Sequence, residues 1–159
     1  MRGFIVSVVV LVVCGMVDVA SCQPMLAIES PVSYSTGHFG WCVSGGGDVD
    51  GDGFLDLVVG APNQTISPNT HGSVYVLRGR DGSVLHVVQS QGTGYINHYT
   101  GHVASFAGDP SIDGFSDFAT DLTWADETPS DPGPWGFAMH AYSGETGQML
   151  WGVRATFVR

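Results

Sequence analysis

The chain repeats itself, and this repeat constrains the fold more than any other feature of the sequence. Residues 40–56, GWCVSGGGDVDGDGFLD, align without a gap to residues 101–117, GHVASFAGDPSIDGFSD, and eight of the 17 positions are identical. Farther on, residues 78–85 align to 143–150 at a shift of 65 instead of 61 residues, so the second copy holds four extra residues, which we place within 123–136. Two copies of one unit are expected to fold alike.

Each copy predicts four short strands. The stretch Ser73-Val74-Tyr75-Val76-Leu77 contains the alternation of a strand, and glycine-rich turns follow at 79–82 and 144–147. The 23 glycines and the low share of charged residues, 13%, also favour strands joined by tight turns over helices. The expected strands are 40–46, 55–60, 73–78 and 84–89 in the first copy and 101–107, 116–122, 137–142 and 148–154 in the second. The sequence therefore predicts an all-β fold of about two antiparallel four-stranded propeller blades, a partial β-propeller.

The N-terminal residues 1–22 are predicted to be a signal peptide. Arg2 precedes an apolar stretch from Phe4 to Val17, which is too short for a comfortable membrane span of about 20 residues. The small residues around Ser21 suit cleavage, although Val-Ala-Ser-Cys also resembles a lipobox in which Cys22 would be lipidated, and an uncleaved anchor is a third reading. In each case the domain leaves the cytoplasm, to be secreted or held in the periplasm or at the cell surface. It would contact a membrane only if Cys22 is lipidated.

Four aspartates crowd into nine residues directly before an apolar strand, and they would repel each other without a cation. Asp48, Asp50, Asp52 and Asp56 stand at positions 1, 3, 5 and 9 of this loop, and Phe54 at position 7 can offer its backbone carbonyl. Such oxygen ligands suit Ca²⁺. A Zn²⁺ site is disfavoured because the loop has no Cys or His, whereas Mg²⁺ and a metal-free acidic turn stay open as alternatives.

An EF-hand loop, which opens with the same pattern, would need a bidentate Glu at position 12, where Val59 stands. The second copy keeps a weaker version of the cation loop. Its candidate ligands are Asp109, Ser111, Asp113, Phe115 and Asp117. Because a serine hydroxyl is a poorer ligand and Pro110 restricts the chain path, a hydrogen-bonded loop without a cation is favoured there.

The motifs of the first copy resemble the FG-GAP repeat, the blade unit of the integrin α-chain β-propeller and of many secreted bacterial proteins. Phe39-Gly40 supplies the FG and Gly60-Ala61-Pro62 the GAP, whereas the second copy has Thr100-Gly101 and Asp121-Leu122-Thr123 at these places. The resemblance divides the chain into a linker or leftover blade strand at 23–37, a first blade at 38–98 and a degenerate second blade at 99–159. It also implies that Asp56 is the last ligand of the cation loop, and that residues 61–71 and 122–136, with Trp124 and Trp135, form the recognition surface.

Charge and missing motifs exclude several function classes. The net charge is −10 and all five basic residues are Arg, so a nucleic-acid partner is not expected. The six histidines form no HExxH pattern, and the sequence has no Gly-x-Ser-x-Gly elbow and no phosphate-binding loop, so an enzyme is not expected either.

The leading interpretation is therefore a non-catalytic, Ca²⁺-binding module for adhesion or interaction with a protein or glycan ligand outside the cell. The alternatives are accessory propeller repeats of a larger secreted enzyme such as a hydrolase, and a structural envelope lipoprotein. Two blades are fewer than the four to eight of a closed propeller. We therefore expect this sequence to be part of a longer protein, or several copies to assemble and close the ring.

Overall fold

The computed structural model describes residues 8–9, 26–32, 37–64, 72–89, 96–128 and 131–157, and within strands it leaves the side chains of 8–9, 96–98, 124–128 and 131–135 undescribed. The predicted signal peptide lies outside this part of the chain, except for β1 (Val8–Val9), which pairs with β2 (Ala27–Ile28). Across the described residues, no helix has the length and apolar character needed to cross a membrane.

The first copy forms one antiparallel sheet of four strands in the order β3-β4-β5-β6. Strands β4 and β5 are buried along their whole length, which explains why their sequences, DLVVGA and SVYVL, are almost entirely apolar. The strands are β3 (Val43–Gly47), β4 (Asp56–Ala61), β5 (Ser73–Leu77) and β6 (Val84–Gln89).

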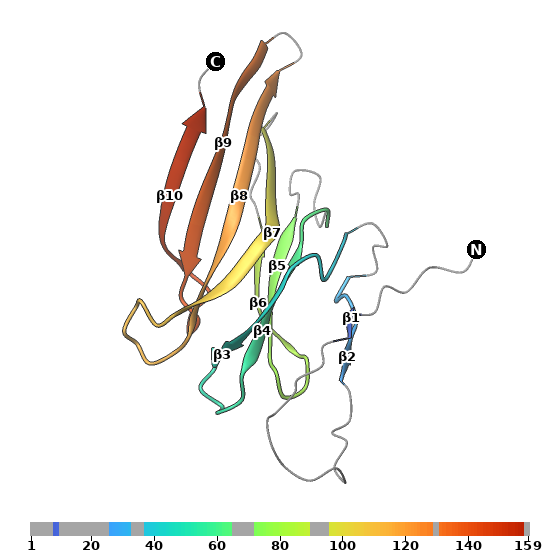
Figure 1. Ribbon diagram of the computed structural model, residues 1–159, viewed down its shortest axis with the longest axis vertical. Coiled ribbons are helices and arrows are strands. Elements are labelled where there is room, and N and C mark those ends of the chain that lie inside the picture. The colour runs from blue at the N-terminus through green and yellow to red at the C-terminus, as the bar shows by residue number, and fades with distance from the viewer. Residues whose placement is uncertain are drawn as a thin grey trace, which may run out of the picture.

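The second copy forms a second antiparallel sheet with the same connectivity, in the order β7-β8-β9-β10. Figure 1 shows the two sheets side by side, with the loops that follow β3 and β7 at the same end of the molecule. The strands are β7 (Ile96–Gly108), β8 (Asp117–Thr128), β9 (Asp131–Tyr142) and β10 (Met149–Phe157). The prediction of an all-β fold with two antiparallel four-stranded blades is thus confirmed.

The strand ends predicted for the first copy are close to those observed, but the hairpin between β8 and β9 differs from the expectation. Residues 122–136 were expected to form a loop because they are rich in Pro and Asp. In the structure most of them continue the two strands, and Thr128 still pairs with Asp131. Trp124 and Trp135 pair within this ladder as backbone positions, and their side chains lie outside the described residues, as do residues 65–71 of the other predicted recognition loop.

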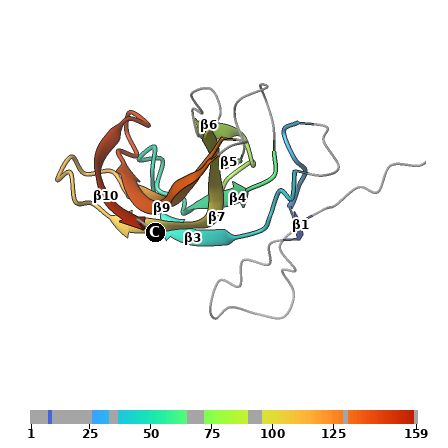
Figure 2. The same cartoon turned by 90° about the horizontal axis from the view of Figure 1, so that it is seen from above.

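The two sheets meet along β7, which contacts β3, β4 and β5 of the first sheet, as the view from above in Figure 2 shows. Val58, Val74 and Val76 of the first sheet are fully buried against Phe118 and Ala104 of the second. Burying one such valine side chain stabilises the fold by roughly 1.5–3 kcal/mol. Val58, Val74 and Val76 lie on β4 and β5, whereas Ala104 and Phe118 lie on β7 and β8, so the interface joins the second and third strands of the first copy to the first and second strands of the second copy.

The other faces of the two sheets are covered differently. Ile28 and Phe39 lie over the far face of the first sheet, where they pack with Tyr75 and Leu77 in a second apolar cluster. On the second sheet, every residue of β10 is exposed. Large apolar side chains of β10 are therefore open to solvent, among them Trp151, Val153 and Phe157.

Candidate metal centre

The aspartate loop connects β3 to β4 and is folded by its own carboxylates. Asp48 accepts hydrogen bonds from the backbone N–H groups of Gly51 and Gly53 at 2.8 and 3.0 Å. Both glycines have positive φ, 72° and 84°, a conformation that side chains disfavour. Asp52 in turn accepts a hydrogen bond from the backbone of Phe54. The alternation of Asp and Gly therefore wraps the loop tightly around its first aspartate.

Three of the predicted ligands converge. Asp48, Asp50 and Asp56 each place one carboxylate oxygen so that the three oxygens lie within 4.8 Å of one another. The Asp52 carboxylate is not part of this group, and the Phe54 ring is exposed at the loop, 5.6 Å from the guanidinium carbon of Arg80. The donor set consists of oxygen atoms alone, which fits a hard divalent cation such as Ca²⁺ and does not fit Zn²⁺.

Asp56 has a structural role of its own in the loop. Its side chain is fully buried at the start of β4 and accepts hydrogen bonds from the backbone N–H groups of Val49 at 2.8 Å and of Gly79 at 2.9 Å. It thus ties the loop to the hairpin between β5 and β6. Burial raises the pKa of Asp56, the two hydrogen bonds oppose this effect, and the nearby charges of Asp50 and Asp48 add to it.

Arg78, directly after β5, reaches into the loop, a contact that the spacing of the residues does not predict. Its Nε donates a hydrogen bond of 2.6 Å to Asp50 Oδ2 and lies 3.8 Å from Asp52 Oδ2. The aspartates therefore already have one cation among them, a guanidinium from the chain itself. The signal for it was present in the alignment of the copies, where Arg78 corresponds to Ser143 and Asp50 to Ser111.

The loop of the second copy keeps part of the hydrogen-bond pattern of the first loop, with fewer carboxylates. Asp109 accepts from the backbone of Asp113 and Gly114, and Asp113 accepts from Phe115. Within the described residues, these carboxylates do not come together as a group of three. Burial acts to raise the pKa of Asp109, but the hydrogen bonds, led by that from Gly114, are stronger in sum and lower it.

Asp117 corresponds to Asp56 and is also fully buried. It accepts hydrogen bonds from the backbone N–H groups of Ser111 at 3.0 Å and Gly144 at 2.9 Å. The loop partner moves by one residue because Pro110 stands where Val49 stands in the first copy, and proline has no N–H to donate. The anchoring role of this aspartate is therefore common to both loops, whereas the converging group is found at the first.

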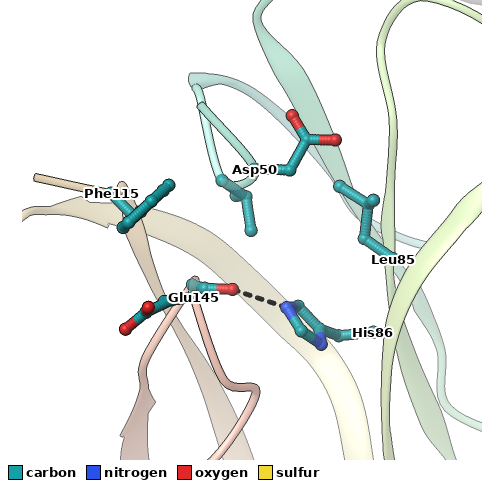
Figure 3. Close-up of a pocket in the computed structure, with 7 residues that line it drawn as sticks. Asp50, Leu85, His86, Phe115 and Glu145 are labelled. Atoms are coloured by element: carbon teal, nitrogen blue, oxygen red, sulfur yellow. Dashed lines mark hydrogen bonds between the residues drawn. The ribbon is translucent and has the colours of Figure 1, made fainter. Parts of the chain in front are cut away.

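A cleft of about 290 Å³ lies beside the loop, between the two sheets. Figure 3 shows that the Asp50 carboxylate points away from His86 and Glu145, which line the cleft from the other side. One ring nitrogen of His86 is paired with the carbonyl of Gly144. Glu145, the other acidic residue of the cleft, is not one of the three converging carboxylates. The lining residues of the cleft are Val49, Asp50, Leu85, His86, Phe115, Gly144 and Glu145.

A group of exposed rings stands at the opposite end of β3 from the aspartate loop. The Trp41 side chain is 60% exposed, its ring stacks on His38 with the ring centres 5.7 Å apart, and His102 meets its edge at 6.2 Å. His102 lies 3.5 Å from the buried carboxylate of Asp121. The sequence alone does not bring these residues together, because their proximity depends on how β7 packs beside β3.

Comparison with known proteins agrees with this geometry. A family model of the FG-GAP repeat matches residues 39–77, from Phe39 through the aspartate loop to the end of β5. No curated protein matches the chain. The matched span contains all three converging carboxylates, and the sheet it begins is repeated by the second copy with the same strand order. The chain therefore contains an FG-GAP repeat at residues 39–77, within an all-β fold of two four-stranded sheets of the kind that form propeller blades.

Proposed function

We propose that the chain is a calcium-binding, non-catalytic interaction module that acts outside the cytoplasm. The convergence of Asp48, Asp50 and Asp56 carries the metal part of this proposal, because three carboxylate oxygens lie within 4.8 Å of one another and Arg78 adds only one positive charge beside them. Oxygen ligands in an irregular loop suit Ca²⁺ better than Mg²⁺, which demands near-ideal octahedral geometry.

The proposed role of the ion is structural. A bound Ca²⁺ supplies the positive charge that offsets the repulsion between the carboxylates. Asp56 connects the same loop to the backbone of Gly79 in the next hairpin, so the order of the loop is transmitted to the β5–β6 connection. Extracellular calcium modules have dissociation constants of roughly 10⁻⁴ to 10⁻³ M, which suits a site that is filled outside the cell.

The non-catalytic part is supported by the way the reactive side chains are used. Burial raises the pKa of the Cys42 thiol, which disfavours the nucleophilic thiolate. Asp121, the partner of His102, already accepts hydrogen bonds from the backbone N–H groups of Gly101 and Val103 and so anchors the start of the second copy. Both features fit structural roles better than catalytic ones.

The interaction part is supported by the exposed rings around Trp41. Aromatic rings with a polar edge are common anchors for protein partners and also stack on sugar rings, so a protein or glycan ligand is proposed. The location outside the cytoplasm is proposed from the signal-like pattern of residues 1–22 and from the lipobox-like Cys22. Mass spectrometry of the mature N-terminus distinguishes a free secreted form from a lipidated one.

The test of the metal site is a calcium titration of the full chain by calorimetry, with thermal melting in calcium and in chelator. At about ten times the dissociation constant, calcium should add about 1.4 kcal/mol to the free energy of unfolding. Asp48→Asn should remove this calcium-dependent part. Asp81→Asn is the control, since Asp81 accepts a hydrogen bond from Ser83 within the nearby hairpin and carries the same charge. Identical melting of the unsubstituted chain in calcium and in chelator would reject the proposal.

A further inference from the structure

We propose that Arg78 is an internal cation that competes with the divalent ion for Asp50 and thereby weakens calcium binding at the first loop. This inference rests on the proposed calcium site and concerns how that site is tuned.

Arg78 occupies one of the two carboxylate oxygens that Asp50 could offer to a metal ion. Its Nε and Nη2 both approach Asp50 Oδ2, at 2.6 and 2.5 Å, while the backbone N–H of Asp52 donates to Asp50 Oδ1. Both carboxylate oxygens of Asp50 are thus engaged. If Asp50 is to coordinate a cation through Oδ2, the guanidinium must move away, because two positive charges cannot share one oxygen at contact distance.

The guanidinium can move because the pair is partly open to solvent. The side chains of Arg78 and Asp50 are 34% and 19% exposed. Ion pairs of this kind contribute little to stability in water, and so a divalent ion can displace them. The competition is therefore expected to reduce the affinity for calcium and not to prevent binding.

The internal repeat shows that the turn does not require an arginine at this position. The backbone of Arg78 donates to Ser83 O and accepts from the N–H of Gly82. In the second copy, the backbone of Ser143 makes the same two bonds, with Gln148 and Gly147. The same hairpin turn therefore forms with serine, which leaves the loop carboxylates as the distinctive partner of Arg78.

The repeat also links the arginine to its carboxylate. The first copy has Asp50 in the loop and Arg78 in the hairpin, whereas the second has Ser111 and Ser143 at the two corresponding places. Both members of the ion pair are thus present in one copy and both are absent from the other. This pattern fits a pair that acts together, one group as ligand and the other as its competitor.

The test compares Arg78→Ser with the unsubstituted full chain in a calcium titration by calorimetry. Arg78→Ser reproduces the residue that the second copy uses in the same turn, so it should fold. We expect its dissociation constant for calcium to be about threefold to tenfold lower, since a competing charge at contact distance is removed. In chelator, Arg78→Ser should melt at a lower temperature than the unsubstituted chain, because its loop carboxylates then have no cation among them.

Arg80→Ser is the matched control, because Arg80 lies in the same hairpin and its guanidinium faces the Phe54 ring. It should leave the calcium affinity within about twofold of the unsubstituted chain. Asp50→Asn in the Arg78→Ser background should remove most of the gain in affinity, since the gain is assigned to the release of Asp50.

The outcomes separate this inference from the proposed function. If the unsubstituted chain binds calcium and Arg78→Ser binds it equally or more weakly, the proposed competition by Arg78 is rejected and the proposed calcium site is retained. If only Arg78→Ser binds calcium, the proposed function fails for the natural chain and the competition is supported in its strongest form. If neither protein responds to millimolar calcium, both proposals are overturned.

Discussion

At the scale of single residues, the two loops show how one position can be relaxed or strained by its side chain. Gly51 and Ile112 correspond in the repeat, and both have a positive φ, 72° and 60°. Glycine adopts this conformation freely, whereas a β-branched side chain is crowded against the backbone. Ile112 is 88% exposed and gains little from packing in return. The second loop therefore holds a strained residue that the first loop avoids.

Replacing Ile112 by Gly should stabilise the protein. The left-handed conformation costs isoleucine about 1–2 kcal/mol, and the extra freedom of glycine in the unfolded chain returns part of this, so the free energy of unfolding should rise by about 0.5–1 kcal/mol. Urea unfolding in chelator measures the change. The reciprocal substitution Gly51→Ala should destabilise, since its Cβ would lie 2.9 Å from the Phe115 ring. A destabilised Ile112→Gly protein would contradict the strain argument.

The residue scale also shows what the sequence could and could not predict about the site. The spacing of Asp48, Asp50 and Asp56 indicated ligands that the structure brings together, because loop residues at alternate positions can turn to one centre. The contact of Arg78 could not be derived from spacing, since it lies 28 residues from Asp50 and depends on how the hairpin docks on the loop. The anchoring role of Asp56 was likewise hidden, because it requires the backbone of Gly79 to approach.

At the scale of strands and sheets, the separation of the two copies is set by a glycine of the GAP motif. A Cβ atom on Gly60 would lie 2.1 Å from the carbonyl oxygen of Gly101 and 2.5 Å from Cys42 Sγ. These groups belong to β7 and to the start of the first copy, and Cys42 Sγ lies 3.6 Å from the same Gly101 oxygen. The backbone of β4 can approach the second copy closely only because this position has no side chain.

Gly60→Ala should therefore destabilise the contact between the two sheets. The contacts are with backbone and with a half-buried sulfur, which cannot simply rotate away, so we expect a loss of roughly 2–3 kcal/mol in the free energy of unfolding. Gly45→Ala is the control within the same sheet, because its nearest neighbour would be Leu57 Cδ2 at 3.4 Å, an ordinary contact. Equal melting temperatures for the two variants would show that the sheets can move slightly apart without loss of stability.

At this scale, the strands of the first copy were predicted more closely than those of the second. The short apolar runs of the first copy, together with the glycine-rich turn at 79–82, located β4 to β6 closely. The hairpin of β8 and β9 was wrongly expected to be a loop, since Pro132 and its acidic neighbours are typical of loops. Proline is compatible with an extended backbone, and the pairing of Glu127 with Pro132 continues the ladder through it.

At the scale of the whole molecule, the repeat identifies an apolar face that is covered in one copy and open in the other. Val88 on β6 packs against the second sheet and is 8% exposed, whereas Val153, at the corresponding place on β10, is 64% exposed. Trp151 lies on the same face of β10, at the position of His86. The far face of the first sheet is already covered by Ile28 and Phe39. In the described part of the chain, the open face of the second sheet is therefore the apolar surface on which another sheet can pack.

We predict that a second copy of the chain packs on this face. It can offer its own β10 face, which gives a two-fold symmetric dimer, the commonest closed assembly. The net charge of −10 on each copy opposes association, so the dimer should strengthen as added salt screens this repulsion.

Val153→Lys should shift the protein to a monomer, because the introduced charge would be buried at the centre of the contact. Light scattering coupled to size exclusion, at about 0.15 M and about 1 M salt, measures the change. Val87→Lys is the control, since Val87 is 45% exposed on β6 of the first sheet and its substitution should leave the dimer unchanged. If the unsubstituted chain is a monomer at high salt, the dimer is rejected and β10 stays exposed to solvent. If the Val153→Lys protein is still a dimer, the contact lies elsewhere on the chain. The exposed apolar residues of β10 would then not be explained by pairing with a second copy.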